Sequence, residues 1–155
     1  MTANIDRLIN EIETLSTFSA SEPPAITRIL YTKQDMEARQ YFKSLCTDAG
    51  LKIREDAIGN IFARWEGSQP DLPAIGTGSH TDAIPLSGKY DGVVGVLGGL
   101  EAIRLLKENG LKPTRSIEVL MFNAEEPTRF GIGCFGSRML SGKMTPDEAR
   151  ALTDK

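Results

Sequence analysis

The feature that most constrains the fold is an alternation of strand and helix patterns in the middle of the chain. A short strand of small residues is predicted over 74–79, a helix over 92–107, and a strongly apolar strand (SIEVLMFN) over 116–123. Helices that alternate with apolar strands are typical of layered α/β domains, in which the crossover helix makes the two strands parallel. We therefore predict an α/β, three-layer domain with a mainly parallel central sheet.

Further elements are predicted on both sides of this unit. Residues 84–90 contain Pro85 and Gly88 and are predicted to form a loop. The other predicted elements are amphipathic helices over 5–18 and 33–49, a hairpin of strands over 51–55 and 60–65, and short helices over 135–140 and 146–151.

Length and composition favour one globular domain and exclude several classes of protein. The 155 residues are 40% hydrophobic and 25% charged, with a formal net charge of −3, which argues against nucleic-acid and anionic-membrane partners. The longest apolar stretch, 93–100, is too short to span a bilayer, and the charged N-terminus does not resemble a signal peptide. Cys46 and Cys134 lie far apart in the sequence; two reduced thiols in a cytoplasmic protein are the simpler interpretation, and a disulfide remains an alternative.

Polar residues follow both strands of the central unit. His80 comes directly after the first strand, Glu125 and Glu126 follow the second, and Asp91 stands where the intervening helix begins. In parallel sheets, ligands bind outside the carboxyl ends of the strands. We therefore expect these four residues to meet at one edge of the sheet.

The segment His80-Thr81-Asp82 contains a possible metal ligand, His80, and a carboxylate that could hold its ring in place. A neutral imidazole binds metals best when a carboxylate or carbonyl holds its other ring nitrogen, and Asp82 could supply that contact. An ordinary histidine beside an unrelated aspartate is the simpler interpretation of this segment taken alone.

Asp91 and the Glu125-Glu126 pair could complete a hydrolytic site. A carboxylate such as Asp91 can bridge two cations, although it can equally be a helix N-cap. Of two adjacent acids, one can bind metal while the other moves a proton, but solvated loop acids are common. The glycines around Asp91 permit close backbone approach; they stand at positions 88, 92, 95, 98 and 99.

Taken together, these motifs resemble those of a known superfamily. The segments GSHTDAIPLSGKYDG at 78–92 and EEPTRFGIGCFGSRML at 125–140, with TRILYT at 27–32 and GNIFARWEG at 59–67, are similar to the dinuclear metallopeptidase superfamily. They most resemble its hydantoinase/carbamoylase-type branch, which includes ureidoglycolate amidohydrolase, allantoate amidohydrolase and N-carbamoyl-L-amino acid hydrolase. The resemblance covers nearly the whole chain.

The resemblance implies a role for each candidate residue. His80 would bind one metal, Asp91 would bridge both, and Glu126 would bind the second. Glu125 would be the general base, and Asp82 would orient His80. The implied cofactors are two divalent metal ions, zinc or manganese. The implied reaction is hydrolysis of a linear C–N bond in a small ureido compound.

The same resemblance implies that this chain is incomplete. Family members are more than twice as long and carry two further metal-binding histidines, together with a lid and dimerisation domain, whereas this chain contains only His80. We therefore expect residues 1–155 to be the N-terminal portion of a dinuclear-metal catalytic domain without the lid, inactive alone, from a parent protein that forms a homodimer. A fragment of a longer product, a truncated reading frame and one half of a split enzyme all fit.

Two alternatives to hydrolysis of a ureido compound remain open. The chain could be a truncated, catalytically inactive fragment, which its histidine count favours. The parent protein could also be a peptidase or aminoacylase of the same superfamily. The residues leave the exact substrate, the metal and the oligomeric state open.

Overall fold

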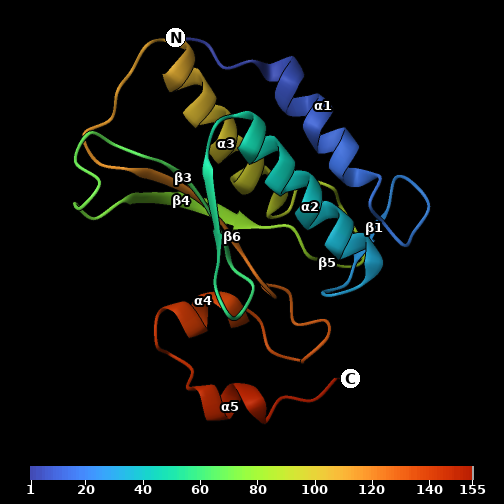
Figure 1. The fold of residues 1–155 in the computed structure, drawn as a ribbon. Helices are drawn as coiled ribbons and strands as arrows, with labels where there is room; N and C mark the ends of the chain where they lie inside the picture. Colours follow the sequence, from blue (N-terminus) through green and yellow to red (C-terminus); the bar gives the residue numbers. More distant parts are fainter. Residues whose placement is uncertain (155) are drawn as a thin grey trace.

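The computed structural model describes residues 1–154, which form a sheet covered by helices and two short helices at one end of that sheet (Figure 1). The helices are α1 (Ile5–Ser16), α2 (Lys33–Asp48), α3 (Val93–Glu108), α4 (Phe135–Leu140) and α5 (Pro146–Arg150). The strands are β1 (Ile26–Arg28), β2 (Lys52–Glu55), β3 (Ile61–Trp65), β4 (Ile75–His80), β5 (Ala83–Ser87) and β6 (Ile117–Phe122).

The larger sheet has the strand order β2-β3-β6-β4 and is mixed. Strands β4 and β6 are parallel, as the helix between them predicts, with Ile75 opposite Ile117 and His80 opposite Phe122. Strands β2 and β3 form the predicted antiparallel hairpin, and β3 also runs antiparallel to β6. The α/β class is therefore confirmed, but the sheet is mixed rather than mainly parallel, because a hairpin occupies half of it.

The three long helices share one core with one face of this sheet. Paired residues of neighbouring strands point to the same face, and the pairs Ile61–Met121 and Ala63–Val119 are buried together with residues of α1, α2 and α3. On the opposite face, Arg64 forms an ion pair with Glu118 at 3.3 Å. Within residues 1–154 the arrangement is thus two-layered, and the third layer predicted from the sequence is not among them.

The predicted loop over 84–90 contains a strand instead. β5 pairs antiparallel with β1, with Ile26 opposite Ser87 and Arg28 opposite Ala83. Pro85 is compatible with a two-stranded ribbon, because a strand with a free edge needs no N–H donor on that side. The prediction failed because the pairing partner lies far away in the sequence.

The segment after β6 folds onto the end of the sheet. Ala124 and Phe135 form a small second core with Leu30, and the α4 backbone packs so closely that a Cβ on Gly136 would lie 2.2 Å from Asn60 Oδ1. Both cysteines are free thiols, so the alternative of a disulfide is not realised. Within the described residues, no helix has the length and apolar character needed to cross a membrane.

Candidate metal centre

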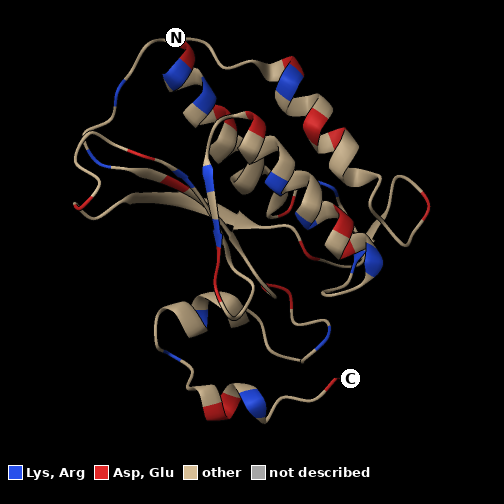
Figure 2. Cartoon of the chain, viewed as in Figure 1, with Lys and Arg blue, Asp and Glu red and all other residues tan. Residues whose placement is uncertain are grey.

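The candidate site lies where β4 and β6 end. His80 is the last residue of β4 and is opposite Phe122 of β6, so the residues that follow β6 leave the sheet beside the imidazole. Asp91 precedes α3, the helix that packs against both strands. Figure 2 shows acidic segments in the loops that leave the sheet toward α4. Chain direction and strand pairing together therefore bring the candidate residues to one edge.

The distances confirm that the predicted residues converge. His80 Nε2 lies 3.7 Å from Asp91 Oδ1 and 3.6 Å from Glu125 Oε2. Ligand atoms of His80, Glu125 and Glu126 lie within 4.8 Å of one another, a spacing that suits a shared metal ion. The imidazole is buried, whereas the Asp91 side chain is 76% exposed. We name this group of His80, Asp82, Asp91, Glu125 and Glu126 the polar edge.

The imidazole is held by the backbone of Asp82. His80 Nδ1 lies 3.0 Å from the carbonyl oxygen of Asp82, and 3.5 Å from the carboxylate oxygen Oδ1 of the same residue. With Nδ1–H donated to the carbonyl, a bound metal that displaced the proton from Nε2 would meet a lone pair on the side of Asp91 and Glu125. The predicted contact between Asp82 and His80 is present, but the hydrogen bond goes to the carbonyl rather than to the carboxylate.

The Asp82 carboxylate holds the loop that carries both glutamates. It is buried and accepts hydrogen bonds from the backbone N–H groups of Glu126, at 2.9 Å, and Glu125, at 3.3 Å. A buried carboxylate needs donors, and two backbone amides supply them here. Asp82 thereby fixes the position of Glu125 and Glu126 relative to His80.

Gly92 allows the α3 start to approach the imidazole. Its φ of +66° is unfavourable for other residues, and a Cβ at this position would lie 2.5 Å from His80 Nε2. The glycine-rich stretch around Asp91 gave a signal for such an approach, but only the structure shows that the neighbour is His80.

The polar edge concentrates negative charge around one imidazole. Burial lowers the pKa of His80, but the hydrogen bond and charge of Asp82, together with the charge of Glu125, outweigh it and raise that pKa to about 9. Burial also raises the pKa of Glu126; His80 opposes this rise, and the charges of Glu125, Asp91 and Asp82 add to it. A divalent cation would offset the mutual repulsion of these carboxylates.

Two residues that support the site were not identified from the sequence. Arg28 is buried and donates to the carbonyl of Thr81 at 2.7 Å and to the carbonyls of Leu15 and Phe18 at 2.9 Å. It thus connects the end of α1 to the turn that carries His80. Cys134 donates its thiol to Glu125 Oε1 at 3.2 Å. Neither contact follows from local sequence, because each joins segments through tertiary packing.

Fold and site together define an α/β domain with a candidate metal centre at the carboxyl ends of two parallel strands. The model of the family described as Peptidase family M28 matches residues 60–153, a span that includes His80, Asp91, Glu125 and Glu126. The chain belongs to this family.

The chain is also similar to curated hydrolases, which confirms the resemblance drawn from its motifs. It is 58% identical over 146 residues to ureidoglycolate hydrolase from Arabidopsis thaliana, covering 94% of this chain and 31% of that protein. It is 40% identical to N-carbamoyl-L-amino-acid amidohydrolase from Paenarthrobacter aurescens (99% and 37%) and 37% identical to allantoate amidohydrolase from Bacillus subtilis (93% and 35%).

Solved structures agree with these relationships. The crystal structure of AtUAH in complex with glyoxylate matches with a TM-score of 0.95 at 53% identity, covering 99% of this chain and 37% of that one. A hydantoinase/carbamoylase family amidase from Burkholderia ambifaria matches with a TM-score of 0.94 at 33% identity (98% and 38%). The chain therefore spans about a third of the length of the proteins it matches.

Proposed function

We propose that this chain contributes the metal-binding residues of an amidohydrolase that cleaves a linear C–N bond in a ureido compound. The observation that carries the proposal is the convergence of His80, Asp91, Glu125 and Glu126 at one strand edge. The similarity to ureidoglycolate, allantoate and N-carbamoyl amino acid hydrolases supports the class of substrate. Ureidoglycolate, allantoate and N-carbamoyl amino acids are the candidates.

The polar edge would hold two divalent ions, zinc or manganese. His80 would bind one ion through Nε2, Asp91 would bridge both, and Glu126 would bind the second. The donor set is nitrogen and oxygen only, which suits either metal. The raised pKa of Glu126 and the carboxylates around it are consistent with a cation between them. Bound metal would polarise the substrate carbonyl and lower the pKa of the attacking water.

Glu125 would serve as the general base. Its Oε2 lies 3.6 Å from His80 Nε2, beside the proposed ligands, and its side chain is partly exposed. It can therefore take a proton from the attacking water and pass that proton to the leaving nitrogen. Asp82 would act by holding His80 through its carbonyl, and Glu125 and Glu126 through its carboxylate.

We also propose that residues 1–155 form the N-terminal portion of the catalytic domain. The further metal ligands and the lid and dimerisation domain would come from residues outside this chain, and the complete protein would be a cytoplasmic homodimer. The chain alone should bind divalent metal weakly, because His80, Asp91 and Glu126 would supply only two protein ligands to each ion, whereas a catalytic zinc normally has three.

Ammonia release tests the proposal directly. The chain alone, and a protein extended by a complete catalytic and lid region, are assayed with each ureido substrate and added manganese or zinc. We expect turnover only in the extended protein. Glu125→Gln should abolish this turnover while metal stays bound. Efficient hydrolysis by the extended Glu125→Gln protein would contradict the role of Glu125.

The family match favours a second candidate, hydrolysis of peptides or acyl-amino acids. The same extended protein, assayed on these substrates, separates the two. Cleavage of acyl-amino acids without cleavage of any ureido compound would select the second candidate. Absence of all turnover by the extended protein would contradict both candidates.

A further inference from the structure

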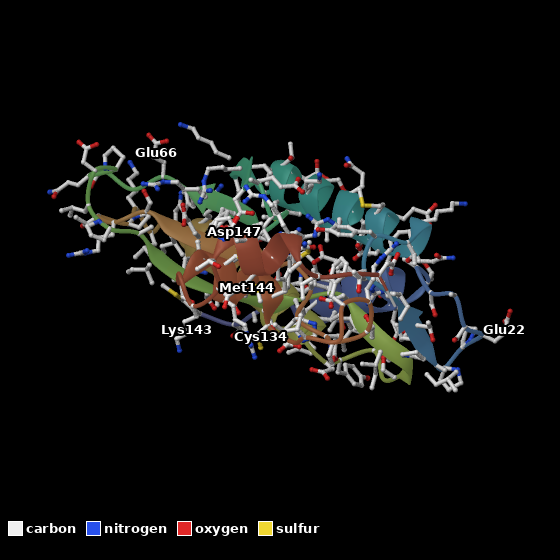
Figure 3. All side chains as sticks on the ribbon, turned by 90° about the horizontal axis from the view of Figure 1, so that it is seen from below. Glu22, Glu66, Cys134, Lys143, Met144 and Asp147 are labelled. Atoms are coloured by element: carbon white, nitrogen blue, oxygen red, sulfur yellow. The ribbon has the colours of Figure 1, made fainter. Side chains whose placement is uncertain are left out.

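The loop between β6 and α4 is closed by two contacts between Glu125 and Cys134. The backbone N–H of Cys134 donates to the Glu125 carbonyl at 2.7 Å, and the thiol donates to Glu125 Oε1 at 3.2 Å. Beside them, the N–H of Phe135 donates to the carbonyl of Ala124 at 2.9 Å. One residue therefore holds both the main chain and the carboxylate of Glu125. Figure 3 shows Cys134 on the same side of the molecule as Lys143 and Met144.

The backbone of Cys134 adopts a conformation that favours glycine. Its φ of 59° and ψ of 29° lie in the left-handed region, which side chains other than Asn and Asp enter rarely. The thiol makes no cap hydrogen bond to α4. Among residues 1–154, its hydrogen-bond partner is the Glu125 carboxylate. The contact with Glu125 thus gives a reason for a side chain at a position where glycine would be less strained.

The thiol distinguishes the two oxygens of the Glu125 carboxylate. Oε1 accepts from the thiol, whereas Oε2 is the oxygen that lies 3.6 Å from His80 Nε2. A partly exposed glutamate would otherwise rotate freely, and proton transfer requires its oxygen at a defined place. The hydrogen bond to Glu125, and then burial, raise the pKa of the Cys134 thiol, so the thiol stays protonated and remains a donor at neutral pH.

We propose that Cys134 is a positioning residue for Glu125. Its thiol anchors one carboxylate oxygen and leaves the other free to accept the proton of the attacking water. The proposal rests on the general-base role proposed for Glu125, and it adds a residue outside the metal ligands on which proton transfer depends.

Alkylation of the 155-residue chain tests the contact without any need for turnover. The rate of iodoacetamide modification is followed against pH, and peptide mass spectrometry separates Cys134 from the fully buried Cys46. In Glu125→Ala, alkylation of Cys134 should begin at lower pH than in the wild-type chain. Glu126→Ala is the charge-matched control and should shift the profile less. If the rate of Cys134 alkylation depended on pH in the same way in the wild-type chain and in Glu125→Ala, the proposal would be overturned.

Turnover in the extended protein tests the consequence. Cys134→Ala should lower kcat about tenfold, because a hydrogen bond to a charged group is lost, with little change in KM or metal content. Cys134→Ser should recover much of the loss, since a hydroxyl can donate to the same oxygen.

The outcomes separate the two proposals. Equal kcat of Cys134→Ala and the wild-type extended protein would overturn the role of Cys134. Failure of the unmodified extended protein to hydrolyse any ureido compound would contradict the proposed function instead, and the alkylation profiles would still decide whether Cys134 binds Glu125.

Discussion

The helix-covered face of the sheet and the polar edge are stabilised by different interactions. The covered face buries apolar side chains of α1, α2 and α3 against β3 and β6, and burial there depends on shape and volume. The polar edge buries His80 and Asp82, and each is held by hydrogen bonds to backbone groups. Apolar packing tolerates many similar sequences, whereas a buried polar group needs a particular partner. Changes in the two regions should therefore have separable effects on stability and on metal binding.

The largest effect should come from removing a large side chain from the covered face. Phe42 is fully buried in the core, and Phe42→Ala should lower the free energy of unfolding by about 3–5 kcal/mol. Urea denaturation followed by circular dichroism measures it. Met36→Ala, on the same helix at a position that is 51% exposed, is the control. Equal losses in both variants would show that α2 does not pack as described.

Gly92, the N-cap residue of α3, and Gly98, within α3, separate effects on the polar edge from effects on the helix alone. Gly92→Ala should cost about 1–3 kcal/mol of stability through backbone strain and should also displace His80, weakening metal binding at least tenfold. Gly98 has open space around its Cβ position, so Gly98→Ala should stabilise the helix by up to about 1 kcal/mol without changing metal affinity. Calorimetric titration with manganese or zinc measures the metal affinity of each variant, and thermal unfolding measures its stability. Metal affinities that are the same in the two variants would contradict the position assigned to His80.

Buried charge at the start of α2 should make stability depend on pH. Asp35 is buried, and burial raises its pKa from 3.8 to about 6, against the effects of the Tyr31 N–H and of Arg39 and Arg28. Between about pH 4 and pH 6 the folded chain keeps a proton that the unfolded chain loses. This contribution therefore makes stability fall as pH rises through that window, by on the order of 2 kcal/mol.

The matched variant for this effect is Asp35→Asn. Its side-chain oxygen can still accept from the Tyr31 N–H, but it carries no titratable group. The free energy of unfolding is measured by urea titration at pH 4, 5, 6 and 7. The fall with rising pH that Asp35 causes should be absent from Asp35→Asn. The same slope in both proteins would show that Asp35 ionises normally in the folded chain.

The smallest expected effect concerns the support that Asp82 gives to the glutamates. Asp82→Asn keeps the carbonyl that holds His80 but weakens acceptance from the Glu125 and Glu126 amides. Metal affinity should fall about tenfold, with a smaller change in stability. Calorimetric titration decides this, with Asp71→Asn, a change in a distant loop, as the control. Unchanged affinity would assign the support of the site to the Asp82 carbonyl alone.

The sequence by itself determined the elements whose signals are local. Apolar periodicity placed the three long helices, the hairpin, the parallel pair β4 and β6, and the short helix Phe135–Leu140. Since parallel strands end at the same edge, the order of His80, Asp91 and Glu125 along the chain was enough to predict that they meet. The motifs were also enough to identify the related hydrolases.

Only the tertiary structure decided which distant segments pair and which atoms carry the contacts. The β1–β5 ribbon joins residues about sixty positions apart, and the direction of β3 beside β6 has no local signature. The carbonyl of Asp82, rather than its carboxylate, accepts from His80, and Cys134 approaches Glu125 because α4 folds back onto the end of the sheet. The periodicity of apolar residues indicates which face of an element is buried. The hydrogen-bond partners at the edge of the sheet depend on backbone geometry, which forms only when the whole chain has packed.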